Sequence, residues 1–287
     1  MQKTTSPGSV SFYSSLSTFL AMARKELLIM ARYPVNFIAS FGQMFLTVSI
    51  FTLAGRLFYD APEGQNITSG GSNPAGVVVY GYILYIFLND TLWTIGYNVR
   101  NEQVQGTLEQ LYLSPASKFA NLVARVTNTL IWTGLLSITG GALMTMLIGR
   151  LPFENPLLGV YIFIMSLMGT FGVGFAFAAL TLQIKETAQT LANLLQFAFL
   201  VLCANFFPFA ALPPFIRDIS RLLPLAYAVD AFRSTLMGFP DGFPELAPFQ
   251  VEFWIVTIFG LGMPILGYFL YRAAERHARS EGSLSNY

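Results

Sequence analysis

RNEQVQGTLEQLYLSP, residues 100–115, is a polar stretch that separates two long apolar runs. The runs that flank it, residues 77–97 and 126–148, are each long enough to cross a bilayer, because about 20 apolar residues span its core as a helix. The polar stretch is therefore predicted to lie at a membrane surface, on one defined side of the bilayer.

The composition of the whole chain is that of a membrane protein with several spans. Its 287 residues are 54% hydrophobic and 11% charged, with a mean hydropathy of +0.56, whereas a soluble domain carries roughly 25% charged residues. The formal net charge is only +1, so the overall charge gives no reason to expect a nucleic-acid partner. The single cysteine, Cys203, excludes an intrachain disulfide.

Six apolar runs are long enough to span a membrane, which predicts an all-α membrane protein with six transmembrane helices. The runs cover residues 35–58, 77–97, 126–148, 157–184, 187–212 and 249–271. In the fourth run, Gly169, Gly172 and Gly174 with Ala176 and Ala179 form a small face that is typical of close helix packing.

The distribution of basic residues predicts the orientation. An even number of spans places both termini on one side, and most of the 16 Lys and Arg residues lie in segments on that side. The positive-inside rule therefore predicts that the termini and the 100–115 segment are cytoplasmic. The basic residues on the outer side are Arg56, Arg150, Arg217, Arg221 and Arg233.

The residues before the first span are predicted to form an amphipathic helix on the inner membrane surface. Their apolar members share a stripe of about 100° on a helical wheel, and they are Phe12, Leu16, Phe19, Leu20, Ala23, Leu27 and Met30. The chain is thus divided into a cytoplasmic segment, 1–34, a membrane domain, 35–271, and a cytoplasmic tail, 272–287.

The segment 212–237 is apolar but contains charges that a lipid-facing span cannot hold, since each costs roughly 2.5 to 3.5 kcal/mol near the midplane. The charged residues are Arg217, Asp218, Arg221, Asp230 and Arg233. Pro213, Pro214 and Pro224 interrupt the segment, so two short re-entrant helices at the outer face are predicted. The i, i+3 spacing predicts that Asp218 pairs with Arg221 and that Asp230 pairs with Arg233.

The 100–115 segment is itself amphipathic. Val104, Leu108 and Leu111 recur at i, i+4 and i+7, Thr107 and Gln110 have the spacing of a capping box, and Pro115 ends the pattern. Periodicity alone leaves two interpretations open: a helix that covers the end of a helix bundle, or a helix that docks in the groove of a partner protein.

Two motifs resemble those of the type-2 ABC export permeases, a family of drug, sodium and polysaccharide exporters. The first resembles E-x-x-x-G-T-L-E-x-L-x-x-x-P and comprises Glu102, Gly106, Thr107, Leu108, Glu109, Leu111 and Pro115. The second resembles L-P … L-P-L-x-Y-x-x-D-x-x-R and comprises Leu212, Pro213, Leu223, Pro224, Tyr227, Asp230 and Arg233. The cluster Arg24, Lys25 and Glu26 also fits, so the resemblance covers nearly the whole chain.

The resemblance implies a type-2 ABC exporter fold and a permease subunit that lacks its own ATPase. In that family two permeases form a homodimer or heterodimer on two copies of a separate ABC ATPase subunit, which binds ATP and Mg, so no cofactor is expected on this chain. The first motif would form the coupling helix, residues about 100–117, that contacts the ATPase. The outer re-entrant gate would contain Pro213, Arg217, Pro224, Asp230 and Arg233.

The resemblance also implies where the substrate passes, because in that family the path runs between the second and fifth spans of the two protomers. The residues that would line it are Tyr82, Tyr85, Asn89, Asp90, Trp93, Gln196, Phe199, Asn205 and Phe206. Asp90 is the one formal charge well inside a span, where an acid is expensive and needs a polar interior or a partner. It is predicted either to be a structural hydrogen-bonding residue or to contact substrate.

We therefore expect a permease subunit, in a prokaryotic cell membrane, that exports an amphipathic, drug-like or lipid-linked molecule. The alternative within the family is a polysaccharide or lipid-linked glycan exporter, and the alternatives from other classes are a lipid-modifying enzyme and a passive channel. No catalytic residue or metal site is predicted. The chain has no G-x-x-x-x-G-K-[ST] loop, its one histidine, His277, is in the tail, and no Cys, His and acid cluster has metal-ligand spacing.

Overall fold

The computed structural model describes residues 24, 28, 32–59, 74–104, 118–148, 151–183 and 187–280. All regular secondary structure in these ranges is helical, so the predicted all-α class is confirmed for this part of the chain. In chain order the helices are α2 (Pro34–Tyr59), α3 (Pro74–Val104), α5 (Lys118–Ile148), α6 (Pro156–Gln183), α7 (Ala188–Leu202), the 3₁₀ turn η1 (Phe209–Ala211), α8 (Pro214–Ser220), α9 (Pro224–Leu236) and α10 (Phe249–Ser280).

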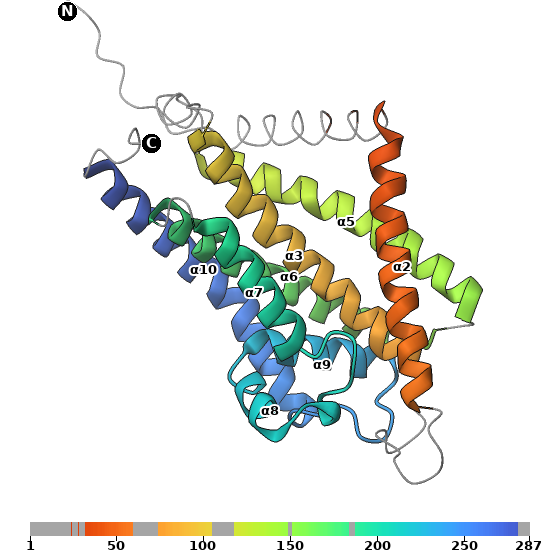
Figure 1. Cartoon of the computed structure of the whole chain (residues 1–287). Coiled ribbons are helices and arrows are strands. Elements are labelled where there is room, and N and C mark those ends of the chain that lie inside the picture. Colours follow the sequence, from red (N-terminus) through yellow and green to blue (C-terminus); the bar gives the residue numbers. More distant parts are fainter. Residues whose placement is uncertain are drawn as a thin grey trace, which may run out of the picture.

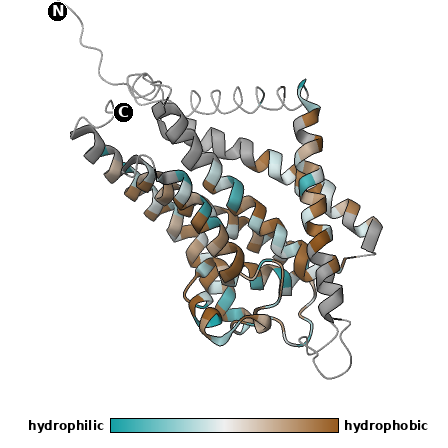
Figure 2. Cartoon of the chain, viewed as in Figure 1, coloured by the Kyte–Doolittle hydropathy of each residue, from teal (hydrophilic) through white to brown (hydrophobic). Residues whose placement is uncertain are grey.

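The long helices run up and down in one bundle (Figure 1). The start of α2 and the end of α10 lie at the same end, and α8 and α9 lie at the opposite end. The central helix is α3, which packs on α2, α5, α6, α7 and α9. Apolar residues cover most of the long helices, while hydrophilic residues gather around α8 and α9 (Figure 2).

Three helices in the described ranges are long and apolar enough to cross a membrane. Their apolar windows are Gly76–Trp93 in α3, Pro156–Thr181 in α6 and Phe249–Ala274 in α10. The windows in α2, α5 and α7 are shorter, at Ile38–Ile50, Leu130–Leu143 and Gln189–Leu202. Each of the six predicted spans contains a helix, but the membrane crossing of these last three helices stays a prediction.

The fifth predicted span, 187–212, is wrong at its end, because α7 stops at Leu202. Ala204 has a φ of 48°, which an L residue rarely adopts and which a right-handed helix cannot continue. The Asn205 side chain donates to the carbonyls of Phe199 and Leu200, at 3.0 and 3.4 Å. These carbonyls also accept the backbone N–H groups of Cys203 and Asn205, so the side chain adds a second hydrogen bond to each at the last turn of the helix. The apolar residues that follow turn back into the bundle.

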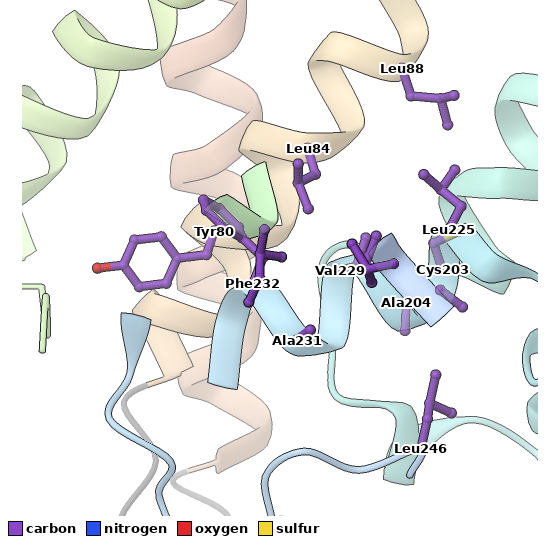
Figure 3. Close-up of a cluster of buried hydrophobic side chains, with 14 of the residues drawn as sticks. Tyr80, Leu84, Leu88, Cys203, Ala204, Leu225, Val229, Ala231, Phe232 and Leu246 are labelled. Atoms are coloured by element: carbon purple, nitrogen blue, oxygen red, sulfur yellow. The ribbon is translucent and has the colours of Figure 1, made fainter. Parts of the chain in front are cut away.

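The largest buried apolar cluster joins α3, α6, α9 and α10 with this returning segment. Figure 3 shows Tyr80 and Leu84 of α3 near Phe232 of α9, and Leu88 of α3 on the side of Leu225. Phe209 is fully buried in the same cluster, so the apolar run beyond Leu202 packs inside the end of the bundle that contains α8 and α9. This end is called the outer end below, after the side on which the sequence predicts it.

The predicted small face of the fourth span is confirmed where α6 meets α10. A Cβ at Gly172 would lie 2.2 Å from the carbonyl carbon of Met263 and 2.5 Å from the nitrogen of Pro264. Since real Cβ atoms do not approach backbone so closely, the absence of a side chain lets the two helices pack backbone to backbone.

Three predicted features lie outside the described residues. They are most of the amphipathic helix before the first span, the 105–117 part of the coupling segment, and the tail beyond residue 280. Residues 100–104 are helical and belong to α3, so Glu102 stands on the last turn of the second long helix.

Candidate functional site

A cavity of about 280 Å³ lies between α2, α3, α5 and α7 and is lined by many polar side chains. Six of the nine residues predicted to line the path meet there, namely Tyr82, Tyr85, Asn89, Asp90, Gln196 and Phe206. The prediction that the second and fifth spans carry these side chains to one place is thus consistent with the geometry. The passage of substrate through this cavity stays a prediction.

The sequence analysis missed the contribution of α2 to this cavity. Ser40, Gln43 and Thr47 of α2 line one side of it, and they recur at i, i+3 and i+7, which places them on one face of the helix. The signal was present in the sequence, because these are polar residues at helical spacing inside an otherwise apolar run. Trp132 and Leu136 of α5 complete the lining.

Asp90 has a hydrogen-bond partner on a neighbouring helix. The Thr133 hydroxyl of α5 donates to Oδ2 of Asp90, and the Asn89 amide donates to Oδ1 at 3.4 Å. The Thr133 side chain is fully buried. The structural role predicted for Asp90 is therefore supported by its bond to α5, and its position on the cavity wall leaves substrate contact open.

Gln196 connects α7 to α3 through two hydrogen bonds. The indole nitrogen of Trp93 donates to Oε1 of Gln196 at 3.0 Å, and Nε2 of Gln196 donates to the Tyr85 hydroxyl at 3.1 Å. Trp93, which was predicted to line the path, thus reaches the cavity wall through Gln196. Because both ends of the amide are used, the rotamer of Gln196 is fixed.

Aromatic rings form the wall of the cavity nearest the outer end. The ring centroids of Tyr82 and Phe206 are 5.6 Å apart, and those of Tyr85 and Phe206 are 6.0 Å apart. Such contacts add about 0.5–1.5 kcal/mol each beyond area burial. They hold the returning segment after α7 against α3.

Two predicted lining residues are used elsewhere. Phe199 packs against the main apolar cluster. Asn205 is 1% exposed and caps α7 with its amide, as described above. The role of Asn205 could not be predicted from spacing, because the predicted span included this residue whereas α7 ends at Leu202.

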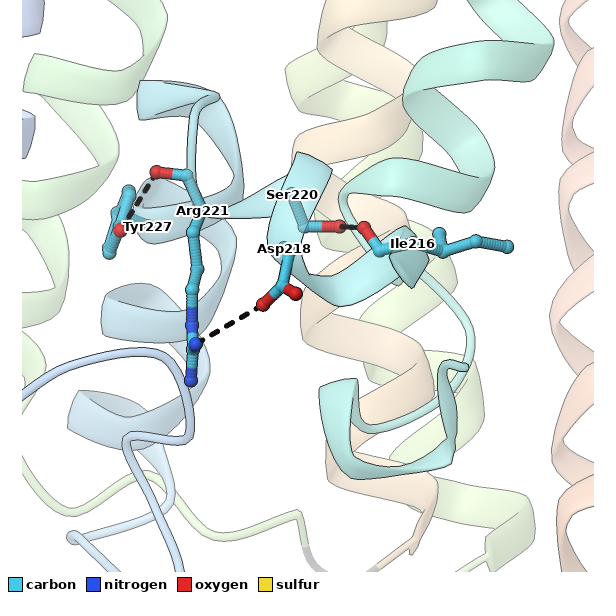
Figure 4. Close-up of polar contacts among 5 residues, drawn as sticks. All are labelled: Ile216, Asp218, Ser220, Arg221 and Tyr227. Carbon is cyan, nitrogen blue, oxygen red and sulfur yellow. Dashed lines mark hydrogen bonds and ion pairs between the residues drawn. The ribbon is translucent and has the colours of Figure 1, made fainter. Parts of the chain in front are cut away.

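At the outer end, the prolines predicted to interrupt the 212–237 segment begin two short helices. Pro213 is the residue before α8 and Pro224 is the first residue of α9. Figure 4 shows the predicted pair of Arg221 and Asp218, whose closest charged atoms are 3.4 Å apart. This exposed pair contributes little stability, and Arg217 lies half-buried on the same helix.

The carboxylate of Asp230 fastens the loop between α9 and α10, residues 237–248, to α9. This loop is called the outer loop below because it lies at the end named above. Its Oδ2 accepts hydrogen bonds from the backbone N–H groups of Glu245 and Leu246, both at 2.7 Å. Glu252 acts similarly at the start of α10, where its Oε1 accepts from the Ala247 N–H at 3.2 Å. Asp230 and Glu252 are both fully buried, so these bonds are shielded from competition with water.

Arg233 connects α9 to the segment that follows α7. Its guanidinium donates to the carbonyl of Ala204 at 2.6 Å and to that of Phe207 at 3.2 Å. Its positive charge also acts on the Asp230 carboxylate, which is the partner that the i, i+3 spacing predicted. Arg233 is fully buried, so it serves as a structural clamp inside the outer end.

Glu245 was also not among the predicted site residues. Its Oε2 accepts the backbone N–H of Ala210 at 2.5 Å, which fastens the outer loop to the 3₁₀ turn. Burial, followed by the charge of Asp230, raises the pKa of Glu245 to about 7. Within the described ranges no group of three His, Cys, Asp or Glu side chains is arranged to hold a metal ion.

These features define the class of the protein: a membrane-integral helical protein whose long helices enclose a polar cavity beneath a cap of short helices. A family model described as ABC-2 family transporter protein matches residues 59–271. The chain therefore belongs to the ABC-2 transporter family, which confirms the resemblance predicted from the two motifs. A search of curated proteins gave no match. Membership makes the chain the membrane subunit of an ABC transporter and implies an ABC ATPase as its partner.

Proposed function

We propose that this chain is the permease subunit of an ATP-driven exporter that moves an amphipathic, drug-like or lipid-linked molecule out of the cytoplasm or inner leaflet. The observation that carries the proposal is the polar cavity enclosed by α2, α3, α5 and α7 within an apolar bundle. Polar groups inside a membrane are expensive and are retained at transport paths.

The cavity combines the two surfaces that an amphipathic molecule needs. Tyr82, Tyr85 and Phe206 offer aromatic rings, while Gln43, Asn89 and Asp90 offer polar groups. The Asn89 Oδ1 atom is buried without a hydrogen-bond partner, so it is a free acceptor for a substrate N–H or hydroxyl group. A mixed lining of this kind favours a molecule with both apolar and polar parts over a simple ion.

The proposed mechanism is a shift between two conformations driven by the partner ATPase. ATP binding closes two ATPase subunits, the coupling helix within residues 100–117 moves, and two permease protomers, in a homodimer, rock until the outer end opens. ATP and Mg belong to the ATPase subunits. The Asp230, Arg233 and Glu245 bonds would hold the outer end closed in the resting state.

The orientation follows from the positive-inside rule applied to the basic residues. The start of α2, the end of α3 and the end of α10 lie at one end of the bundle, and we place that end on the cytoplasmic side of a prokaryotic cell membrane. The cap of α8 and α9 would then lie on the outer side, where an exported molecule leaves.

Reconstitution of the chain with its ATPase in lipid vesicles tests the proposal. We expect candidate amphipathic molecules to stimulate ATP hydrolysis and to be moved in the direction away from the ATPase. Charge reversal at the predicted contact, Glu109→Lys, is expected to preserve basal hydrolysis and remove its stimulation. The matched control is Asp241→Lys, a reversal at an exposed position in the outer loop.

Two outcomes would contradict the proposal. Movement of the molecule by the chain alone, without ATPase or ATP, would identify a passive channel. Chemical conversion of a lipid by the purified chain would identify an enzyme.

Normal coupling in Glu109→Lys would remove the 100–117 segment from the contact with the ATPase.

A further inference from the structure

A second cavity, of about 480 Å³, lies between α3, α5, α6 and α9. Its walls are apolar or small side chains, including Val79, Ile83, Phe87, Phe163 and Phe232, and no charged residue lines it. The volume falls in the range of roughly 300–1,000 Å³ that is usual for small-molecule sites.

This second cavity, called the groove below, is separate from the polar cavity. On α5 the polar cavity touches Trp132 and Leu136, whereas the groove touches Gly134, Ile138 and Gly141. At about 100° per residue these two sets lie on opposite sides of the helix. The groove is therefore a distinct site, divided from the predicted path by α5.

The space exists because α5 packs on α3 and α2 without packing closely on α6, and because the α5 wall of the groove carries the half-buried glycines 134 and 141. A Cβ placed at Gly134 or at Gly141 would meet nothing within 4 Å. The Ser137 hydroxyl, which also lines the groove, is buried and has no hydrogen-bond partner. The polypeptide thus leaves this space unfilled.

The groove opens toward the surroundings of the bundle. Three residues that line it, Ile138, Phe153 and Val160, are 72%, 61% and 52% exposed. Apolar side chains that are exposed on the surface of a membrane-integral bundle face lipid unless a second copy of the chain covers them. Glu154 and Asn155, which are exposed beside Phe153, supply polar groups at the open end.

The length of the groove matches one leaflet. From Gly134 to Thr145 the α5 wall rises about 16 Å, and from Val79 to Phe87 the α3 wall rises about 12 Å, at 1.5 Å per residue. Half of a bilayer core is about 15 Å thick. The groove occupies the half of the bundle that contains α8 and α9.

We propose that this groove binds one acyl chain of a bilayer phospholipid from the leaflet at the α8 and α9 end. Water does not fill an apolar cavity of this kind, and an unfilled gap forfeits the dispersion contacts of every atom that lines it. An alkyl chain supplies those contacts without a charge to satisfy, and the polar end of the groove suits the glycerol and headgroup. The proposal concerns a resident lipid and stands apart from the identity of the exported molecule.

The bound chain would touch the back of the outer cap. Phe232 and Leu236 of α9 line the groove, and Phe232 is in ring contact with Tyr80 and Phe163. Asp230 and Arg233, which hold the outer loop and the segment after α7, stand on the same helix. The lipid would therefore pack against α9, the helix that carries both Asp230 and Arg233.

Photolabelling of the full complex tests the proposal. The chain and its ATPase are reconstituted in phosphatidylcholine vesicles that contain a small share of phosphatidylcholine with a diazirine on its acyl chain, and labelled peptides are identified by mass spectrometry after irradiation. We expect residues 134–145 and 156–163 to be labelled several-fold more than the exposed apolar face of α10 around Ile258, Leu261 and Ile265, which samples ordinary surrounding lipid.

A matched pair of variants separates binding from chance contact. Gly141→Leu places an apolar side chain in the groove from a position where an added Cβ has nothing within 4 Å, and it should lower the labelling of the groove to the level of α10. Gly262→Leu makes the same change at an exposed glycine of α10, also with nothing within 4 Å, and should leave the groove labelling unchanged. Gly134→Leu repeats the test at the other end of the groove if Gly141→Leu does not fold.

Three results would overturn the proposal. The first is equal labelling of the groove and of the α10 face in the unmodified chain. The second is undiminished groove labelling in folded Gly141→Leu or Gly134→Leu. The third is efficient disulfide formation between two copies of an Ile138→Cys variant, which would show that a second copy of the chain covers the groove.

Discussion

The hydroxyl of Thr133 donates a hydrogen bond to the carboxylate of Asp90, and this bond joins α5 to α3 beside the polar cavity. Thr133 is completely buried, so the donor lies on the side of Asp90 away from the cavity interior. The other carboxylate oxygen receives only a long bond, 3.4 Å, from Asn89. Oδ2 of Asp90 therefore makes a structural hydrogen bond, whereas Oδ1 is available to a substrate.

Paired substitutions separate the two roles of Asp90. Thr133→Val keeps the shape of the donor side chain but removes its hydroxyl, which should destabilise the protein by about 1–3 kcal/mol because a buried acceptor is left unpaired. Asp90→Ala removes the same hydrogen bond and should cost a similar amount of stability, but it should also lower the transport rate per folded protein, which Thr133→Val should leave unchanged. Transport in vesicles and thermal unfolding in detergent are the measurements. Equal transport rates for Asp90→Ala and the unmodified chain would remove Asp90 from the path.

Gln196 offers a test of how α7 is held to α3. Gln196→Leu removes an acceptor from Trp93 and a donor from Tyr85, and we expect a loss of about 1–3 kcal/mol in stability because both partners lose a hydrogen bond. The matched control is Gln189→Leu, at an exposed position of the same helix, which should change stability far less. The thermal unfolding midpoint measures both, and a similar shift in the two variants would show that the bridge is not a stabilising feature.

Much of the fold could be predicted from local patterns. Apolar runs located the long helices, because a bilayer requires about 20 apolar residues in a row, and the i, i+3 rule found the pair of Asp218 and Arg221. The prolines at 213, 214 and 224 were predicted to interrupt the segment, and Pro214 and Pro224 are the first residues of α8 and α9, where proline is tolerated.

The features that escaped prediction depend on partners distant in sequence. The segment that follows the end of α7 at Leu202 is held by the burial of Phe209 against other helices. The main hydrogen-bond partners of Asp230 are backbone groups 15 and 16 residues away. The polar residues Ser40, Gln43 and Thr47 of α2 could be seen in the sequence. Their place in the cavity wall could not, because it depends on how α2 packs beside α3 and α7.

Gly81 provides a test of the packing beneath the outer cap. A Cβ at this position would lie 2.1 Å from Nη2 of Arg233 and 2.1 Å from the carbonyl oxygen of Asn205. Gly81→Ala should therefore force both groups to move and cost about 1–3 kcal/mol or more, as overpacking does. Gly42→Ala on α2, where nothing lies within 4 Å, should be neutral or stabilising, since alanine favours a helix by up to about 1 kcal/mol. The thermal unfolding midpoint of each variant is the measurement. Equal shifts in Gly81→Ala and Gly42→Ala would contradict the close packing at Gly81.

The raised pKa of Glu245 predicts how the stability of the outer end depends on pH. Its pKa is about 7 in the folded protein, above the ordinary value of 4.5, chiefly because the side chain is buried and then because Asp230 is near. Folding therefore favours the protonated form. The stability that this group contributes is complete below pH 4.5 and is lost as the pH rises through 7.

Glu245→Gln isolates this contribution, because an amide has the shape of the protonated acid and does not titrate. We expect the unfolding midpoint of the unmodified chain to fall between pH 4.5 and 7 relative to that of Glu245→Gln, which should show a flatter profile. Asp230, Glu252 and Arg233 act on the same site, so the comparison uses the difference between the two profiles. Asp241→Asn, at an exposed acid of the same loop, should keep the slope of the unmodified chain. Parallel profiles for Glu245→Gln and the unmodified chain would show that Glu245 does not bind its proton more tightly in the folded protein than in the unfolded one.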